Sequence, residues 1–166
     1  MRKLSVTGLM TITLIALLAL AALPAATATQ TLTYQVAAIN ELTVSGSPGP
    51  LIINTASAGS EPALVTDAST TYAITTNGGN NSRKITAQLD SDMPPGLTLC
   101  ITLFGPTGAD TPPTDVILTT APADVVICIN SVAQSGLTIT YTLSAAVTVG
   151  VVNPATRIVT LIITSS

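Results

Sequence analysis

Residues 70–90 read TTYAITTNGGNNSRKITAQLD, and this stretch decides the fold class. Apolar or β-branched residues occupy alternate positions from Tyr72 to Thr76 and again from Ile85 to Leu89. A period of two places them on one face of a strand, and the Asn and Gly residues at 77–81 supply the positive φ angles of a chain reversal. We therefore predict a β-hairpin across residues 70–90. The residues expected to face water on its second strand are Lys84, Thr86 and Gln88.

The same pattern of short alternating segments continues over most of the chain after residue 28. Helical spacing of apolar residues is almost absent there. Many short strands at intervals of about 8 to 15 residues favour an all-β fold, an antiparallel β-sandwich of the immunoglobulin-like type, with a closed barrel as the alternative. The other strands are expected at 31–38, 41–45, 51–54, 97–103, 116–120, 125–130, 137–143 and 157–164.

The N-terminal residues have the three-part order of a secretory signal peptide. A basic start at Met1-Arg2-Lys3 is followed by an apolar run of 15 residues from Leu9 to Leu23, and then by Pro24-Ala25-Ala26-Thr27-Ala28. The run is too short for an ordinary membrane-spanning helix and ends in small residues. We predict a signal-peptide helix, residues 1–28, cleaved after Ala28, with 29–166 as one domain and no stable membrane span after cleavage. The alternative is an uncleaved N-terminal anchor. The expected location is secreted or extracytoplasmic, at the cell surface or in the periplasm.

The composition of residues 29–166 argues against nucleic acid as a partner. Three basic residues stand against eight acidic ones, a net charge of −5, and the only adjacent basic pair is Arg83-Lys84. A phosphate backbone needs several clustered cations. Threonine fills 25 of these 138 positions, which suits the outer faces of strands. The aromatic residues available for stacking on a ligand are only Tyr34, Tyr72, Phe104 and Tyr141.

No catalytic constellation is visible. The chain contains no His, which removes Ser/His/Asp and Cys/His arrangements, His-ligated zinc and the commonest general base near neutral pH. Lys84 follows Arg83 beside a predicted turn, where a solvated position is expected. Phosphate-binding and dinucleotide-binding glycine motifs are absent. We therefore expect a protein that is not an enzyme and has no catalytic residue and no cofactor.

Cys100 and Cys128 are the only cysteines, and an even number in an exported chain favours a structural disulfide over metal ligation or thiol chemistry. Both alternate with the apolar residues of their predicted strands, so both are expected to point away from the core. Two outward cysteines can form a bridge only across neighbouring strands of one sheet. The prediction is a Cys100–Cys128 disulfide of this kind.

Asp90 and Asp92 are the acidic pair with ligand-like spacing, and loop carboxylates are ligands that calcium prefers. One pair lacks the rest of a coordination shell, and Asp is common in turns, so these two residues are weak candidates for a metal site. More ligands would be available only if the fold gathers other loops. The residues that could supply them are Asp110, Asp115 and Asp124.

The segment Thr31–Ala38 alternates apolar and polar residues and is the clearest strand at this end of the chain. Packing within its own sheet is the ordinary outcome and the one we expect. The alternative is strand donation, in which the segment leaves its own domain and completes the sheet of a neighbouring molecule.

Three stretches carry a family resemblance: Val36–Glu41, Ile85–Asp90 and Leu137–Leu143, together with the final strand rich in Val and Thr. They resemble small exported bacterial β-proteins without an assigned activity and, more loosely, pilin and coat-type sandwich subunits. The resemblance implies an exported sandwich domain. We expect a non-enzymatic secreted or cell-surface structural or interaction protein that acts through its surface by adhesion or strand-mediated assembly, with protein or cell-surface partners that include copies of itself. The alternative is a soluble extracytoplasmic ligand-binding module stabilised by calcium.

Overall fold

The computed structural model describes residues 26–78, 82–112 and 114–166, so the predicted signal peptide lies outside the described residues except for Ala26–Ala28. The chain divides into two compact units, residues 1–35 and 36–166, and every described strand belongs to the second unit. No helix in the described part is long and apolar enough to cross a membrane.

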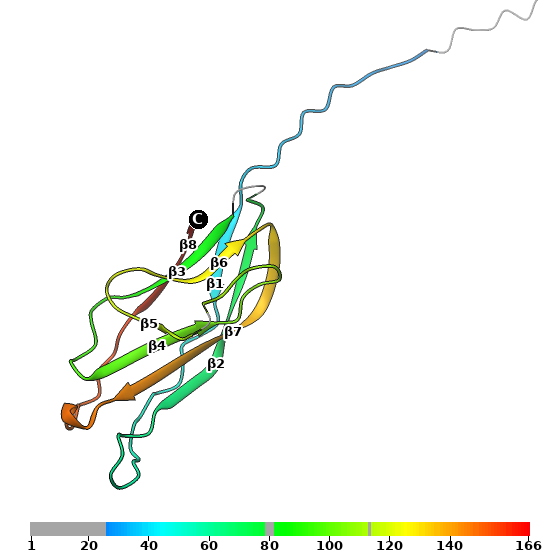
Figure 1. Cartoon of the computed structure of the whole chain (residues 1–166). Coiled ribbons are helices and arrows are strands. Elements are labelled where there is room, and N and C mark those ends of the chain that lie inside the picture. The colour runs from blue at the N-terminus through cyan, green and yellow to red at the C-terminus, as the bar shows by residue number, and fades with distance from the viewer. Residues whose placement is uncertain (1–25, 79–81, 113) are drawn as a thin grey trace, which may run out of the picture. The chain divides into compact units, whose positions relative to one another are not determined.

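The all-β prediction is confirmed, because the described residues form eight strands and a single short 3-10 helix (Figure 1). The strands are β1 (Asn40–Val44), β2 (Val65–Thr76), β3 (Arg83–Leu89), β4 (Leu97–Leu103), β5 (Val116–Ile117), β6 (Ala123–Ile129), β7 (Val132–Ala145) and β8 (Val159–Ser165). The helix η1 (Val147–Val149) follows β7.

The strands form two antiparallel sheets with one core between them. The larger sheet has the order β1-β2-β7-β4-β5, and the smaller has the order β6-β3-β8. Side chains from both sheets join a single hydrophobic cluster, including Tyr72 and Ile139 from the larger sheet and Ile85 and Val126 from the smaller one. This is the arrangement of a β-sandwich, and the closed barrel considered as the alternative is wrong.

The predicted hairpin across residues 70–90 is wrong, although both of its strands exist. β2 pairs with β1 and β7, whereas β3 pairs with β6 and β8, so the chain passes from one sheet to the other between them. The alternation around Ile74 in β2 and around Ile85 in β3 indicates that each strand has a buried face. It does not indicate whether the two strands share a sheet or lie in sheets that pack across a core. Here β2 and β3 lie in different sheets that pack across the core. Part of the connection, residues 79–81, lies outside the described residues.

Strand boundaries agree best where alternation is strict. The prediction of 97–103 matches β4 residue for residue, and 137–143 lies within the longer β7. Only Val116–Ile117 of the predicted 116–120 is a strand, and residues 51–54 and 31–38 form none. On β3, Gln88 and Lys84 are partly exposed as expected, but Thr86 is buried.

The edge strand β6 departs from simple alternation. Val125 and Val126 are both buried, and Ile127 is exposed, although Ile127 is a core position in a regular strand. Two register shifts interrupt the β3–β6 pairing, and Cys128 has a positive φ of 59°. An irregular strand of this kind twists and bends, so the period of two cannot locate its buried residues.

Candidate functional site

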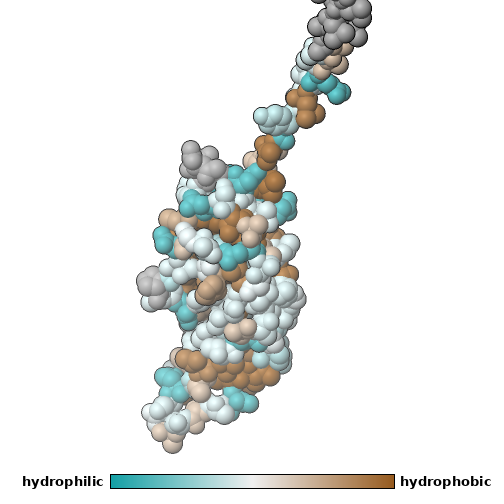
Figure 2. All heavy atoms as spheres, turned by 90° about the vertical axis from the view of Figure 1, so that its right-hand side faces the viewer, coloured by the Kyte–Doolittle hydropathy of each residue, from teal (hydrophilic) through white to brown (hydrophobic). Residues whose placement is uncertain are grey.

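The segment expected to pack as a first strand does not do so. None of residues 31–38 belongs to a strand, and the exposed fractions of Leu32, Tyr34 and Val36 are 83%, 88% and 80%. The strand predicted at 31–38 is therefore not formed, and no described strand pairs with these residues. The alternating apolar residues remain in water, which is unfavourable for large apolar side chains. Figure 2 shows hydrophobic residues exposed along this segment. We call residues 31–38 the donor segment.

Asn77 fixes the chain at the C-terminal end of the donor segment. Its side-chain oxygen accepts a hydrogen bond of 2.6 Å from the N–H of Ile39, and its side-chain amide donates one of 2.8 Å to the C=O of Ala37. The N–H of Asn77 also donates to the C=O of Ile39 at 3.2 Å. These contacts hold residues 37–39 beside the end of β2, immediately before β1 begins.

β8 is the outer strand of the smaller sheet, and one side of it has no partner strand in the described part of the chain. Near the end of its ladder with β3, the N–H of Ser166 donates to the C=O of Ser82 at 3.1 Å, so the even-numbered residues bond to β3. In an antiparallel pair, residues that bond to the neighbouring strand alternate with residues that do not. The odd-numbered residues of β8 therefore direct their N–H and C=O groups away from β3. We call these groups the free edge of β8; they belong to Val159, Leu161 and Ile163.

β1 is an outer strand of the larger sheet, and one of its sides also has no partner strand among the described residues. The N–H of Ser45 donates to the C=O of Thr71 at 2.8 Å, so the odd-numbered residues bond to β2 and the backbone groups of Leu42 face outward. β1 and β8 lie close to each other although they belong to different sheets. Their free edges therefore adjoin where the two sheets meet, and we call this boundary the seam.

The core is incompletely covered at the seam. On β3, Ile85 and Ala87 are completely buried. On its neighbour β8 the core-facing side chains pack against the same cluster but are only partly buried. These side chains are Val159, Leu161 and Ile163, and Leu42 on β1 is partly buried in the same way. Another apolar strand paired with the free edge of β8 would extend this cover.

The other two sheet edges are already protected. β5 is only two residues long, and β6 is irregular around Cys128. The outer side of β6 also pairs with the loop before β5, because Asp110 and Ile127 exchange two backbone hydrogen bonds of 2.9 and 2.8 Å. Short strands, irregularities and covering loops are the usual means of blocking edge-to-edge association. β8 has none of them: its ladder with β3 shows no register shift, and its sequence VTLIITS carries no charge.

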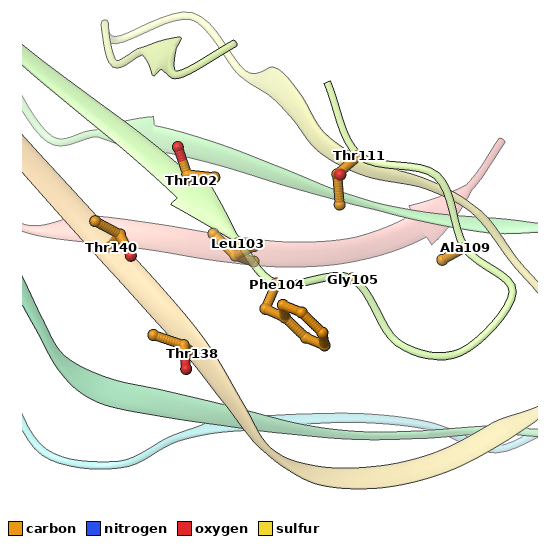
Figure 3. Close-up of a pocket in the computed structure, with 8 residues that line it drawn as sticks. All are labelled: Thr102, Leu103, Phe104, Gly105, Ala109, Thr111, Thr138 and Thr140. Atoms are coloured by element: carbon orange, nitrogen blue, oxygen red, sulfur yellow. The ribbon is translucent and has the colours of Figure 1, made fainter. Parts of the chain in front are cut away.

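A shallow hollow of about 530 Å³ lies where β4 ends (Figure 3). It is lined by Thr102, Leu103, Phe104, Gly105, Ala109, Thr111, Thr138 and Thr140, none of which is charged. Figure 3 shows the Phe104 ring between the threonines of β7 and the loop that carries Ala109. Phe104 is 67% exposed, so part of this aromatic residue is open to a ligand beside several threonine hydroxyl groups.

The predicted disulfide is not formed, and Cys100 and Cys128 are both free. Both are at least partly exposed, as the alternation predicted. However, Cys100 lies on β4 in the larger sheet and Cys128 on β6 in the smaller one, so the requirement for neighbouring strands of one sheet is not met. Burial and nearby Asp115 raise the pKa of the Cys100 thiol. A hydrogen bond to Asp110 is the main cause of the raised pKa of Cys128.

Asp90 and Asp92 serve as hydrogen-bond acceptors for the backbone. The Asp90 carboxylate accepts from the N–H of Ile158 at 2.9 Å, and the Asp92 carboxylate accepts from the N–H of Thr120 at 2.8 Å. The Arg157 guanidinium donates to the backbone C=O of Asp92 at 3.2 and 3.1 Å. These contacts fasten the loop after β3 to the start of β8.

The three other candidate Asp residues do not join them. Asp124 forms an ion pair of 3.0 Å with Lys84, Asp115 accepts a hydrogen bond from Thr102, and Asp110 lies beside Cys128. Within the described residues, no group of three or more acidic, Cys or His side chains could hold a metal ion.

No protein-family description matches this chain, and no protein of curated function matches it either. The site therefore rests on the geometry alone. Sequence reasoning identified the donor segment and predicted the final strand at 157–164, but did not predict that one edge of this strand is free. The signal was present in residues 158–163, which are apolar on both faces and uncharged up to the end of the strand.

Proposed function

We propose that this protein is a non-enzymatic secreted or cell-surface structural protein, an immunoglobulin-like sandwich that assembles with copies of itself through its N-terminal segment. The observation that carries the proposal is the exposure of Leu32, Tyr34 and Val36 on a segment that alternates like a strand but pairs with none. Export by a cleaved signal peptide would place the donor segment at the new N-terminus, where a terminal strand is free to pair with another molecule.

The energetics favour burial of this segment. Removing a large apolar side chain from water contributes roughly 1.5–3 kcal/mol, and the donor segment has three of them. An added strand also gains backbone hydrogen bonds with the edge that it joins. A non-enzymatic role is supported by the absence of His from the chain and by the raised pKa of both thiols, which disfavours the nucleophilic thiolate.

The test compares substitutions on the two faces of the donor segment in the exported, purified protein. Leu32→Ser combined with Tyr34→Ser and Val36→Ser removes the apolar face. Thr31→Ser combined with Thr33→Ser and Gln35→Ser is the matched control on the polar face. Sedimentation velocity over a range of protein concentrations reads the oligomeric state. We expect concentration-dependent oligomers in the parent and the control, and monomers in the apolar-face variant. A parent protein that stays monomeric at every concentration would refute the proposal.

A second candidate function is the binding of a small uncharged ligand in the hollow at the end of β4. Its support is the Phe104 ring, which is exposed beside Thr138 and Thr140 although its own backbone is fixed by hydrogen bonds. Aromatic faces and hydroxyl groups together suit neutral polyhydroxylated molecules such as sugars. Titration of soluble oligosaccharides by NMR would show shifts around Phe104 that disappear in Phe104→Ala and persist in Ile117→Ala, a control at another exposed residue.

A further inference from the structure

We infer that the donor segment of one molecule binds the free edge of β8 in a second copy, where it borders the seam and extends the smaller sheet from three strands to four. This inference rests on the proposed function and adds the receiving strand. It follows from four properties of the described residues: backbone direction, side-chain face, charge, and the reach of the chain.

Backbone direction provides the hydrogen bonds. The N–H and C=O groups of Val159, Leu161 and Ile163 point away from β3, and no described strand pairs with them. An extended segment placed alongside can exchange main-chain hydrogen bonds with all three residues. This is recognition by strand addition, in which the backbone supplies affinity and alternate side chains supply specificity.

The side-chain faces also agree. Val159, Leu161 and Ile163 face the core, and residues directly opposite one another in adjacent strands point to the same side of a sheet. A donor segment that pairs with these residues therefore directs its own alternate residues toward the seam. In the register that buries the apolar set, Leu32 and Tyr34 would cover the partly buried side chains of β8, and Thr33 would face water.

Charge does not oppose the pairing. The donor segment TLTYQVAA and the strand VTLIITS both lack charged residues, in a chain with charged side chains elsewhere. The free edge of β1 is the competing site, but it offers a shorter strand with the carboxylate of Glu41 and a single core-facing residue, Leu42. β1 is the edge of the five-stranded sheet and β8 the edge of the three-stranded one, so a strand added at β8 makes the two sheets more equal in size.

The reach of the chain selects a second copy as the partner. To lie on its own β8, the donor segment would have to reverse direction within the few residues before β1. The reversal would fall on the last two residues of the donor segment and Ile39, and Asn77 holds this stretch with three hydrogen bonds. The segment of another molecule meets no such restriction, and the pairing can then repeat from molecule to molecule.

Proline scanning of β8 provides the first test. The N–H of Leu161 is not used in the ladder with β3, so Leu161→Pro leaves that ladder intact but removes an outward donor and blocks the edge. Leu161→Ala is the matched control for loss of the side chain. We expect Leu161→Pro to weaken association about tenfold or more relative to Leu161→Ala, because a lost hydrogen bond and a steric block together exceed the 1.4 kcal/mol that corresponds to a factor of ten.

Mixing tests whether donor and acceptor reside on different molecules. Tyr34→Lys should disable the donor segment, and Thr33→Lys is its control on the water-facing side. Neither Leu161→Pro nor Tyr34→Lys is expected to associate alone, but their mixture should form pairs of one molecule of each kind. Native mass spectrometry distinguishes these mixed pairs by mass. A mixture that remains monomeric would overturn the inference.

Amide hydrogen exchange provides a readout that does not depend on proline being tolerated. In the assembled parent protein, the amides of Val159, Leu161 and Ile163 should exchange slowly, and in Tyr34→Lys they should exchange fast. If the oligomer depends on Tyr34 but these amides stay unprotected, or if Leu42→Pro rather than Leu161→Pro abolishes it, then assembly is real and β8 is not the receiving strand. If substitutions in the donor segment have no effect on assembly, the proposed function fails as well.

Discussion

The phenolic hydroxyl of Tyr72 on β2 donates a hydrogen bond of 2.8 Å to the backbone C=O of Phe104. The Tyr72 side chain is only 1% exposed, so this contact lies at the margin of the core. The N–H of Phe104 donates in turn to the C=O of Thr138 at 2.9 Å. Both backbone polar groups of Phe104 are therefore satisfied, and the chain leaving β4 is fixed to β2 and β7.

Replacing Tyr72 by Phe should remove this contact and preserve the packing of the ring. We expect Tyr72→Phe to lower the free energy of unfolding by about 1 kcal/mol, the net contribution of a typical hydrogen bond. Tyr141 offers a matched control, because its ring is also buried and its hydroxyl makes no hydrogen bond within the described residues. Urea unfolding monitored by circular dichroism measures both variants. Equal effects of Tyr72→Phe and Tyr141→Phe would contradict the importance of the contact.

The sequence predicted single strands well because a buried face imposes a period of two on each of them. For β4, every odd residue from Leu99 to Leu103 is buried, and the predicted bounds are correct. The pairing of strands was harder to predict, because Ile74 and Ile85 alternate in the same way whether they share a sheet or face each other across a core. The hairpin and the disulfide both failed for this reason.

Of the two parts of the candidate site, the sequence predicted the donor segment but not the free edge of β8. The alternation of Leu32 and Tyr34 identified a strand-like segment, but its exposure depends on whether another strand is available to pair with it. The free edge of β8 depends on the order of three strands in space, which single-strand patterns do not encode. The exposure of Ile127 was not predicted, because the positive φ at Cys128 disrupts the alternation of buried and exposed residues around it.

Cys100 and Cys128 should behave as free thiols in the folded protein. The pKa of each is raised above the ordinary value of 9.0, so the reactive thiolate is scarce at neutral pH. We expect alkylation by iodoacetamide to be slow at neutral pH, to accelerate at alkaline pH, and to reach exposed Cys128 before Cys100. Mass spectrometry of the intact protein follows the reaction. A protein that takes up label only after a reductant is added would contradict the separation of the two cysteines.

Calcium should leave the melting temperature unchanged. The Asp90 and Asp92 carboxylates already accept backbone hydrogen bonds, and no other acidic group of the described residues joins them. Asp90→Ala should instead lower stability by about 1–2 kcal/mol in metal-free buffer, because the N–H of Ile158 loses its acceptor. Thermal unfolding with calcium and with a chelator measures both effects. A calcium-dependent rise that disappears in Asp90→Ala would restore the metal site.

Asp67 should make stability depend on pH in the acid range. Its carboxylate accepts hydrogen bonds from the side chain and the backbone of Ser69, and from Gly49, and these lower its pKa from the ordinary value of 3.8. A lowered pKa in the folded state stabilises the protein above the unfolded value, and this contribution is lost as the pH falls through the folded value.

Asp67→Ala should therefore be less stable than the parent at neutral pH, and the difference should shrink in acid. Urea unfolding at a series of pH values measures it, with Glu41→Ala on the exposed strand β1 as the control carboxylate. A difference between the parent and Asp67→Ala that stays constant across the series would show that the effect does not come from ionisation.

Among the glycines whose surroundings the structure describes, Gly96 should be the least tolerant of substitution. Its φ is +84°, and a Cβ atom there would lie 2.4 Å from Cγ2 of Val149 in η1. Gly59 has the same φ of +84° but no atom within 4 Å of the corresponding position. The pair separates two effects: Gly59→Ala measures the left-handed backbone alone, about 1–2 kcal/mol, and Gly96→Ala adds the clash.

We expect Gly96→Ala to be less stable than Gly59→Ala by about 1–3 kcal/mol, the usual penalty for forcing extra atoms into a packed site. Combining Gly96→Ala with Val149→Ala should recover part of the loss, since the obstructing methyl group is then removed. Urea unfolding of the four variants, including Val149→Ala alone, completes a double-mutant cycle. Additive effects in that cycle would show that Gly96 and η1 do not pack against each other as the structure has them.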